Sequence, residues 1–151
     1  MTEWNRKELW RKFGKDFMVE ISRHEETVSY ASGCFDEEGP HRWCVYAYVY
    51  PKHAHFSKFN GTEDMWQDAA TSLPFHGGPS FCRKHISAKG EATSYQVGAD
   101  YYHLNDWRYT QFATQAEACA VFNDADELFE RLQGGSETLT TDLFAGQEGG
   151  A

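Results

Sequence analysis

The strongest strand signal in this sequence is the stretch Arg42-Trp43-Cys44-Val45-Tyr46-Ala47-Tyr48-Val49-Tyr50. β-branched and aromatic residues favour extended chain. In a strand the side chains alternate, so one side would hold Trp43, Val45, Ala47 and Val49, and the other Tyr46, Tyr48 and Tyr50. A strand that is apolar on both sides is either central in a sheet, or covered on one side with an aromatic surface on the other.

Four further segments have the alternation of strands. Residues 16–23 place Phe17, Val19 and Ile21 on one side, and residues 27–35 follow as a second strand. Downstream, residues 80–87 and 92–98 form a hairpin around Ala88-Lys89-Gly90-Glu91. Tight turns between consecutive strands predict a sheet that is largely antiparallel.

Three segments are predicted to be helical. Residues 3–13 form a short basic helix with Leu9, Trp10 and Phe13 on one side and Gly14 as its cap. Residues 62–71 form a second helix that Thr62 caps. The third begins at the capping box Thr114-Gln115-Ala116-Glu117, keeps helical spacing as far as Leu132, and ends at Gly134-Gly135.

The predicted fold is α+β, in the order α-β-β-β-α-β-β-α. We expect a sheet of about five strands with helices packed on one face. Residues 1–135 form a single domain with its basic helix at 3–13, and a Ser/Thr/Gly-rich, disordered acidic tail follows at 136–151. A chain of 151 residues is long enough to bury a core, and a 16% aromatic content compensates for a modest 40% hydrophobic content.

Charge is unevenly distributed. The net charge is −9, yet residues 1–15 hold five bases and two acids, so the rest of the chain carries −12. Nucleic-acid backbones are bound by Lys and Arg, so we expect no direct contact with nucleic acid. An acidic body suits a basic protein partner, or solubility alone. No run of about 18 apolar residues is present and no apolar signal core follows the N-terminus, which predicts a cytoplasmic protein that does not enter a membrane.

Cysteine and histidine spacing predicts neither a disulfide nor a complete metal site. Cys34, Cys44, Cys82 and Cys119 lack zinc spacing, and we expect free thiols. His53 and His55 form a His-x-His pair, whose rings would point the same way on extended chain, as metal ligands do. Two ligands are an incomplete set, so no metal and no cofactor are assigned. His76, His103 and Asp100 complete it only if folding brings them together.

Two loops carry the candidate ligand-binding residues. One is the stretch 65–81, whose paired glycines offer backbone N–H groups to an anion, although Pro79 lacks one and no Gly-Lys-Ser/Thr follows. The other is the aromatic stretch 98–109, in which His103 with Asp100 or Asp106 is a base-and-orienter candidate. The candidate ligand-binding residues of the two loops are His76, Gly77, Gly78, Ser80, Asp100, Tyr102, His103, Asn105, Trp107 and Arg108.

The runs Met65–Phe81 and Tyr95–Thr114, together with the last helix, resemble a family of small uncharacterised proteins carried by bacteriophages and plasmids. The resemblance covers about residues 25–132 and brings no settled activity, so no catalytic residue is assigned from it. It implies a bacterial cytoplasm and a mobile element, where small acidic proteins often block host defence, as anti-CRISPR proteins do. That inference is an association and has no physical basis in the residues.

Three functions remain open. The first is an interaction protein that inhibits a host defence or nucleic-acid-handling complex by occupying its basic surface. Its contacts would be Asp36, Glu37, Glu38, Tyr46, Tyr48, Tyr50, Glu127 and Glu130. The second is a small-ligand or nucleotide-binding protein that uses the loops 76–80 and 100–109. The third is a metal-dependent enzyme that uses His53, His55, His76 or His103.

Overall fold

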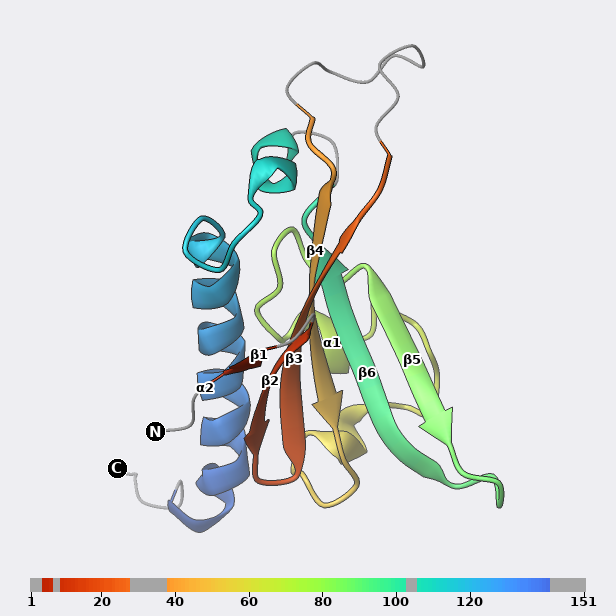
Figure 1. The fold of residues 1–151 in the computed structure, drawn as a ribbon. Helices are drawn as coiled ribbons and strands as arrows, with labels where there is room; N and C mark the ends of the chain where they lie inside the picture. The colour runs from red at the N-terminus through yellow and green to blue at the C-terminus, as the bar shows by residue number, and fades with distance from the viewer. Residues whose placement is uncertain (1–3, 7–8, 28–37, 103–105, 142–151) are drawn as a thin grey trace.

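A computed structural model describes residues 4–6, 9–27, 38–102 and 106–141 of the chain (Figure 1). Its six strands are β1 (Asn5–Arg6), β2 (Leu9–Gly14), β3 (Phe17–Glu25), β4 (His41–Val49), β5 (Phe81–Ile86) and β6 (Ala92–Asp100). They form one antiparallel sheet in the order β1-β2-β3-β4-β6-β5. The helices are α1 (Asp68–Thr71), α2 (Cys119–Thr141) and the 3-10 helices Phe56–Lys58 and Trp107–Gln111. The predicted α+β class is confirmed.

One face of the sheet forms the hydrophobic core with α2. The inward residues of β3 and β4 are fully buried, as the alternation predicts: Phe17, Val19, Ile21, Trp43, Val45, Ala47 and Val49. Phe122 of α2 meets the stacked rings of Trp10 and Trp43 edge-on, and Phe129 meets Phe17. Ala69 and Ala70 of α1 belong to the same core cluster. Stacking and edge contacts of this kind add to the gain from area burial.

The opposite face of the sheet carries Tyr46 and Tyr48. The two rings pack across strands, Tyr46 edge-on against Phe81 and Tyr48 stacked on His85. A Cβ at Gly98 would overlap the Tyr46 ring, so this ring lies directly over the glycine in the neighbouring strand. Burial raises the pKa of Tyr48 to about 12, so its hydroxyl stays protonated.

The predicted helix at 3–13 is wrong, because the described residues 5–6 and 9–13 of this segment lie in β1 and β2. Its burial alternates with period two: Trp10 and Lys12 are buried, whereas Arg11 and Phe13 point outward and Phe13 is 54% exposed. Lys12 can face the core because its ammonium pairs with Asp126 of α2 at 2.7 Å and lies over the rings of Trp4 and Phe129. The predicted order of elements fails at its first element.

The other predicted elements differ at their ends. The helix predicted at 62–71 is reduced to α1, because the segment before it is a loop closed by the Gln67 side chain. The predicted stop at Gly134-Gly135 is wrong, since α2 continues to Thr141. The strand predicted at 27–35 lies outside the described residues except for Thr27, and so does the tail beyond Thr141. Among the described helices, none combines the length and the apolar character needed to cross a membrane.

Candidate functional site

The two loops singled out by the sequence meet at one end of the sheet. His76 Nε2 lies 3.0 Å from Asp106 Oδ1, so the loop after α1 contacts the loop after β6. The His76 ring stacks on Tyr101 with centroids 4.4 Å apart and meets Tyr109 edge-on. Tyr101 is buried and donates its hydroxyl to Asp124 of α2 at 2.7 Å. Burial, followed by this carboxylate, raises the pKa of Tyr101.

This arrangement pairs a histidine with a carboxylate that orients it. The side chain of His76 is 26% exposed and that of Asp106 is 11% exposed, so solvent reaches the imidazole but hardly the carboxylate. If Nε2 carries the proton toward Asp106, Nδ1 is the basic nitrogen, as in a general base with its orienting partner. Among the described residues, His76 is thus a partner of Asp106. His103, which the sequence also offered, lies outside the described residues together with Asn105.

The glycine loop does not supply the anion cradle that its composition suggests. Gly77 and Gly78 both have positive φ, 70° and 86°, which glycine adopts without strain. The N–H of Gly78, however, donates to the Phe75 carbonyl, and that of Ser80 donates to Gly98. Pro79 has no N–H at all. Most of the amides that would bind an anion are therefore unavailable.

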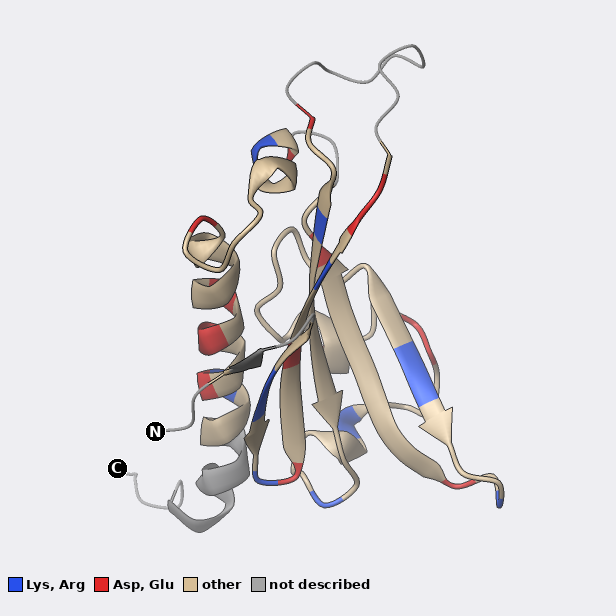
Figure 2. Cartoon of the chain, viewed as in Figure 1, with Lys and Arg blue, Asp and Glu red and all other residues tan. Residues whose placement is uncertain are grey.

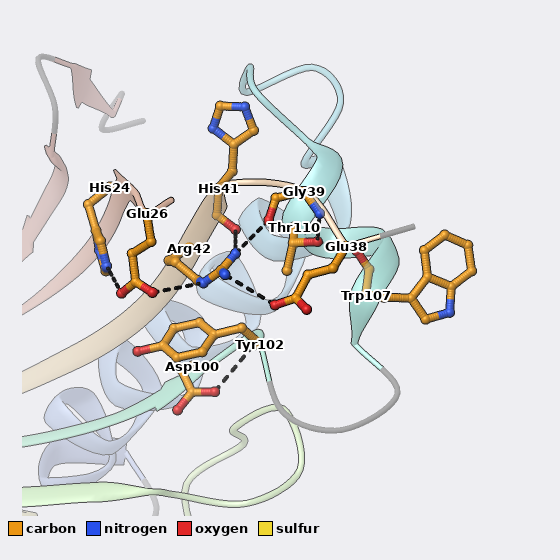
Figure 3. A network of polar contacts seen from close by, with 10 residues as sticks. All are labelled: His24, Glu26, Glu38, Gly39, His41, Arg42, Asp100, Tyr102, Trp107 and Thr110. Carbon is orange, nitrogen blue, oxygen red and sulfur yellow. Dashed lines mark hydrogen bonds and ion pairs between the residues drawn. The ribbon is translucent and has the colours of Figure 1, made fainter. Parts of the chain in front are cut away.

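On β4, Arg42 joins three segments in a polar network that Figure 3 shows from close by. Its guanidinium pairs with Glu26 at 3.4 Å and with Glu38 at 3.1 Å, and it donates to the Gly39 carbonyl at 2.7 Å. It also lies over the ring of Tyr102, 5.6 Å from the centroid. Arg42 is buried, and a buried cation needs such partners.

The same network fixes the loop after β6. The N–H of Gly39 donates to the Thr110 hydroxyl at 2.7 Å, and that hydroxyl donates to the Trp107 carbonyl. The N–H of Tyr102 donates to Asp100 at 3.2 Å. Hydrogen bonding by His24, followed by the charge of Arg42, holds the pKa of Glu26 below its usual value. Glu38, one of the acids proposed as a partner contact, is therefore already paired, while Asp36 and Glu37 lie outside the described residues.

Tyr102, Trp107 and Arg108 are exposed at this end. Tyr102 is 39% and Trp107 is 44% exposed. Burial raises the pKa of Tyr102 to about 12, so its hydroxyl remains a donor at neutral pH. Arg108 is exposed and its guanidinium reaches the Tyr109 hydroxyl at 3.4 Å. These side chains and His76 are the described groups here that a bound molecule could reach.

His53 and His55 are held by backbone carbonyls. His53 Nε2 lies 2.9 Å from the Leu132 carbonyl of α2, and His55 Nε2 lies 2.6 Å from the Ala69 carbonyl of α1. Because a carbonyl only accepts, each Nε2 carries the proton, and His53 Nδ1 accepts the N–H of His55. Both histidines are buried in a turn, and the His53 ring contacts α2 whereas the His55 ring contacts α1. Within the described ranges, no three His, Cys, Asp or Glu side chains gather as a metal site would require.

The remaining candidate contacts fall on opposite sides of the molecule. Glu127 and Glu130 are exposed on α2, which covers the core face of the sheet. Tyr46 and Tyr48 lie on the face away from that core, and they and Tyr50 are only partly exposed. One flat partner surface cannot contact both groups. Cys44, Cys82 and Cys119 are free thiols, and Cys34 lies outside the described residues.

Sequence reasoning missed the structural roles of Arg42 and Gln67, and the exposure of Trp66. Arg42 and Gln67 are buried polar side chains with several partners, and their types give no signal of this. Trp66 lies in the segment predicted to be helical at 62–71, and the 68% exposure of its side chain was not predicted. The acids around it, Glu63 and Asp64, were the available signal, since they make an unfavourable setting for a core residue.

No protein-family model, curated protein or solved structure matches this chain. The resemblance to bacteriophage and plasmid proteins gains no support from these comparisons. Any functional inference therefore rests on the side chains described above.

Proposed function

We propose that this chain is a protein-binding protein whose acidic surface on α2 docks on a basic surface of a protein partner. The observation that carries the proposal is the outer side of α2. Glu127 and Glu130 are three residues apart, share one side of the helix and are exposed. Figure 2 shows acidic positions along the helix. Complementary charge across an interface speeds association and selects the partner.

Neighbouring carboxylates extend this acidic surface. Asp126 is 48% exposed although one oxygen binds Lys12 and Trp4. Glu117 is exposed at the start of the helix, where hydrogen bonds from the N–H groups of Ala113 and Thr114 lower its pKa. These carboxylates add to the acidic character of the surface that Glu127 and Glu130 present.

The partner class follows from the charge and from the resemblance. A complex that handles nucleic acid carries a Lys- and Arg-rich surface for the phosphate backbone, which an acidic protein can occupy in its place. We therefore propose a host defence or nucleic-acid-handling complex of a bacterial cell, as an anti-CRISPR protein would bind. The tyrosines of the opposite sheet face are not part of this contact.

The test is affinity capture of tagged protein from bacterial lysate, followed by mass spectrometry of the retained proteins. Glu127→Lys and Glu130→Lys reverse one charge each on the acidic surface, and Glu91→Lys makes the same change in the exposed β5–β6 turn. A nucleic-acid-handling complex retained by wild type and by Glu91→Lys, but lost with the two helix variants, supports the proposal. Equal retention by all four proteins contradicts it.

A second candidate is small-ligand binding between the loops 76–80 and 100–109, favoured by the His76–Asp106 contact and by the accessible rings of Tyr102 and Trp107. A nucleobase would stack on one of these rings. A thermal-shift screen of nucleotides tests it, with His76→Ala as the variant that should lose any stabilisation. If no nucleotide raises the melting temperature of the wild-type protein, this candidate fails.

A further inference from the structure

Trp66 exposes more of its surface than any other large hydrophobic side chain in the described part of the chain. It is 68% exposed, compared with 59% for Ile86, 54% for Phe13 and 44% for Trp107. Leaving an indole in water forgoes the burial of a large apolar area. The fold therefore does not explain this side chain by packing. Large exposed aromatic residues are enriched among the anchors of protein interfaces.

The loop that carries Trp66 is held in one conformation by the buried side chain of Gln67. Its Nε2 donates to the carbonyls of Thr62 at 3.0 Å and Asp64 at 2.9 Å, and its Oε1 accepts the N–H of Asn60 at 3.2 Å. Next to it, the N–H of Trp66 donates to the Asp64 carboxylate at 2.9 Å. A loop whose backbone is already held in place loses less entropy when a partner binds it.

The loop is also fastened to the edge of the sheet. The N–H of Lys84 in β5 donates to the Glu63 carboxylate at 2.9 Å, and the Lys84 ammonium donates to the Gly61 carbonyl at 2.9 Å. Figure 2 shows acidic positions of this segment beside the basic positions of β5. Trp66 therefore projects from a rigid support and keeps its exposure.

The charged side chains within the Trp66 loop are acidic, and the Lys84 ammonium of β5 lies at its Gly61 end. Glu63, Asp64 and Asp68 are all exposed. From Asn60 to Phe81 the sequence has no Lys or Arg. A partner that accepts the indole would have to meet these carboxylates at the rim of its pocket, and basic side chains would match them.

We propose that Trp66 is the anchor of a second protein-binding surface, which inserts into an apolar pocket rimmed by Lys or Arg on a protein partner. The surface consists of Trp66, Glu63, Asp64 and Asp68. It rests on the proposed function in one respect, that the chain binds a protein. The Trp66 surface differs from the acidic surface on α2 in place and in mechanism. Here an apolar anchor supplies most of the affinity, and the acids select the partner.

The test is selection of a random peptide library, displayed on phage, against the immobilised full chain. We expect the enriched peptides to combine aromatic or aliphatic residues with Lys or Arg. Synthetic copies of these peptides should bind Trp66→Ala at least about 30-fold more weakly than wild type, the effect expected of an anchor residue. Phe13→Ala removes another exposed aromatic ring, on β2, and should leave the affinity unchanged. Trp66→Ala should also keep the wild-type melting temperature, because the indole is mostly in water.

The outcomes separate this surface from the one on α2. Peptides that lose affinity with Glu127→Lys or Glu130→Lys, but not with Trp66→Ala, support the α2 surface and overturn the Trp66 surface. Peptides with the reverse dependence support the Trp66 surface alone. Enriched peptides rich in acids, binding that ignores Trp66→Ala, or the absence of any enriched sequence each overturn the inference.

Discussion

Gln67 shows at the residue scale how buried polar side chains connect distant or irregular parts of this chain. Its amide closes the loop 60–67, as Arg42 closes the loops around Gly39 and as His53 ties its turn to α2. The residue types alone predict none of this, because the partners are mostly backbone groups that only the fold brings near. The sequence likewise suggested His53 and His55 as metal ligands because it does not show the backbone carbonyls that their Nε2 atoms bind in the fold.

Replacing Gln67 by Ala should destabilise the protein by about 1–3 kcal/mol, because the change removes a buried side chain together with its hydrogen bonds to the Asn60 N–H and to the Thr62 and Asp64 carbonyls. Urea unfolding measures the change. Gln115→Ala is the matched control, since Gln115 is exposed and its loss should shift the free energy by no more than about 0.5 kcal/mol. Equal effects of the two substitutions would argue against the role assigned to Gln67.

His55 should make folding stability depend on pH. Burial lowers its pKa below the usual 6.5, which the unfolded chain keeps. Below about pH 6.5 the unfolded state therefore binds more protons than the native state, and stability falls as the pH falls toward the folded pKa. The free energy of unfolding should drop more between pH 7 and pH 5 for wild type than for His55→Gln. Parallel profiles would show that His55 does not contribute.

At the element scale, the strands were predictable because apolar residues that face the core, such as Phe17, Val19 and Ile21, recur at every second position of the sequence, although burial itself runs continuously through much of β3 and β6. The stretch 42–50, the segment 16–23 and the hairpin 80–98 all match β4, β3, β5 and β6 closely. The strands in the segment 3–13 were not predictable, because Lys12 occupies an inward position and its partner, Asp126, comes from a distant part of the chain. Without that partner, the apolar residues fit helical spacing better than alternation.

The 60–67 loop covers the free edge of β5, and this protection of the edge can be tested. Glu63 accepts the N–H of Lys84, a backbone group that would otherwise be open to another strand. Glu63→Ala should therefore promote edge-to-edge association, seen by light scattering as a mass that rises with concentration. Glu91→Ala loses the same charge in the β5–β6 turn and should behave as wild type. If the Glu63 variant keeps the wild-type mass at every concentration, the edge is protected by other means.

At the scale of the whole molecule, the sheet separates two surfaces that composition alone could not separate. Acids of α2 lie over the core face, and the tyrosines of β4 lie on the other. The α+β class and the meeting of the two loops at His76 were within reach of the sequence, because strand order places the loops at one end of the sheet. The sequence could not show that Asp106 contacts His76, since this contact depends on where the side chains lie within those loops.

The salt dependence of partner binding tests the central claim, that acids on α2 bind a basic protein surface. The dissociation constant of the captured partner would be measured by titration calorimetry at low and high ionic strength, for wild type, Glu127→Lys/Glu130→Lys and Glu91→Lys. We expect the wild-type affinity to fall steeply with salt, and the double variant to bind at least about 10-fold more weakly with a smaller salt effect. An affinity that neither salt nor the double charge reversal changes would contradict the claim.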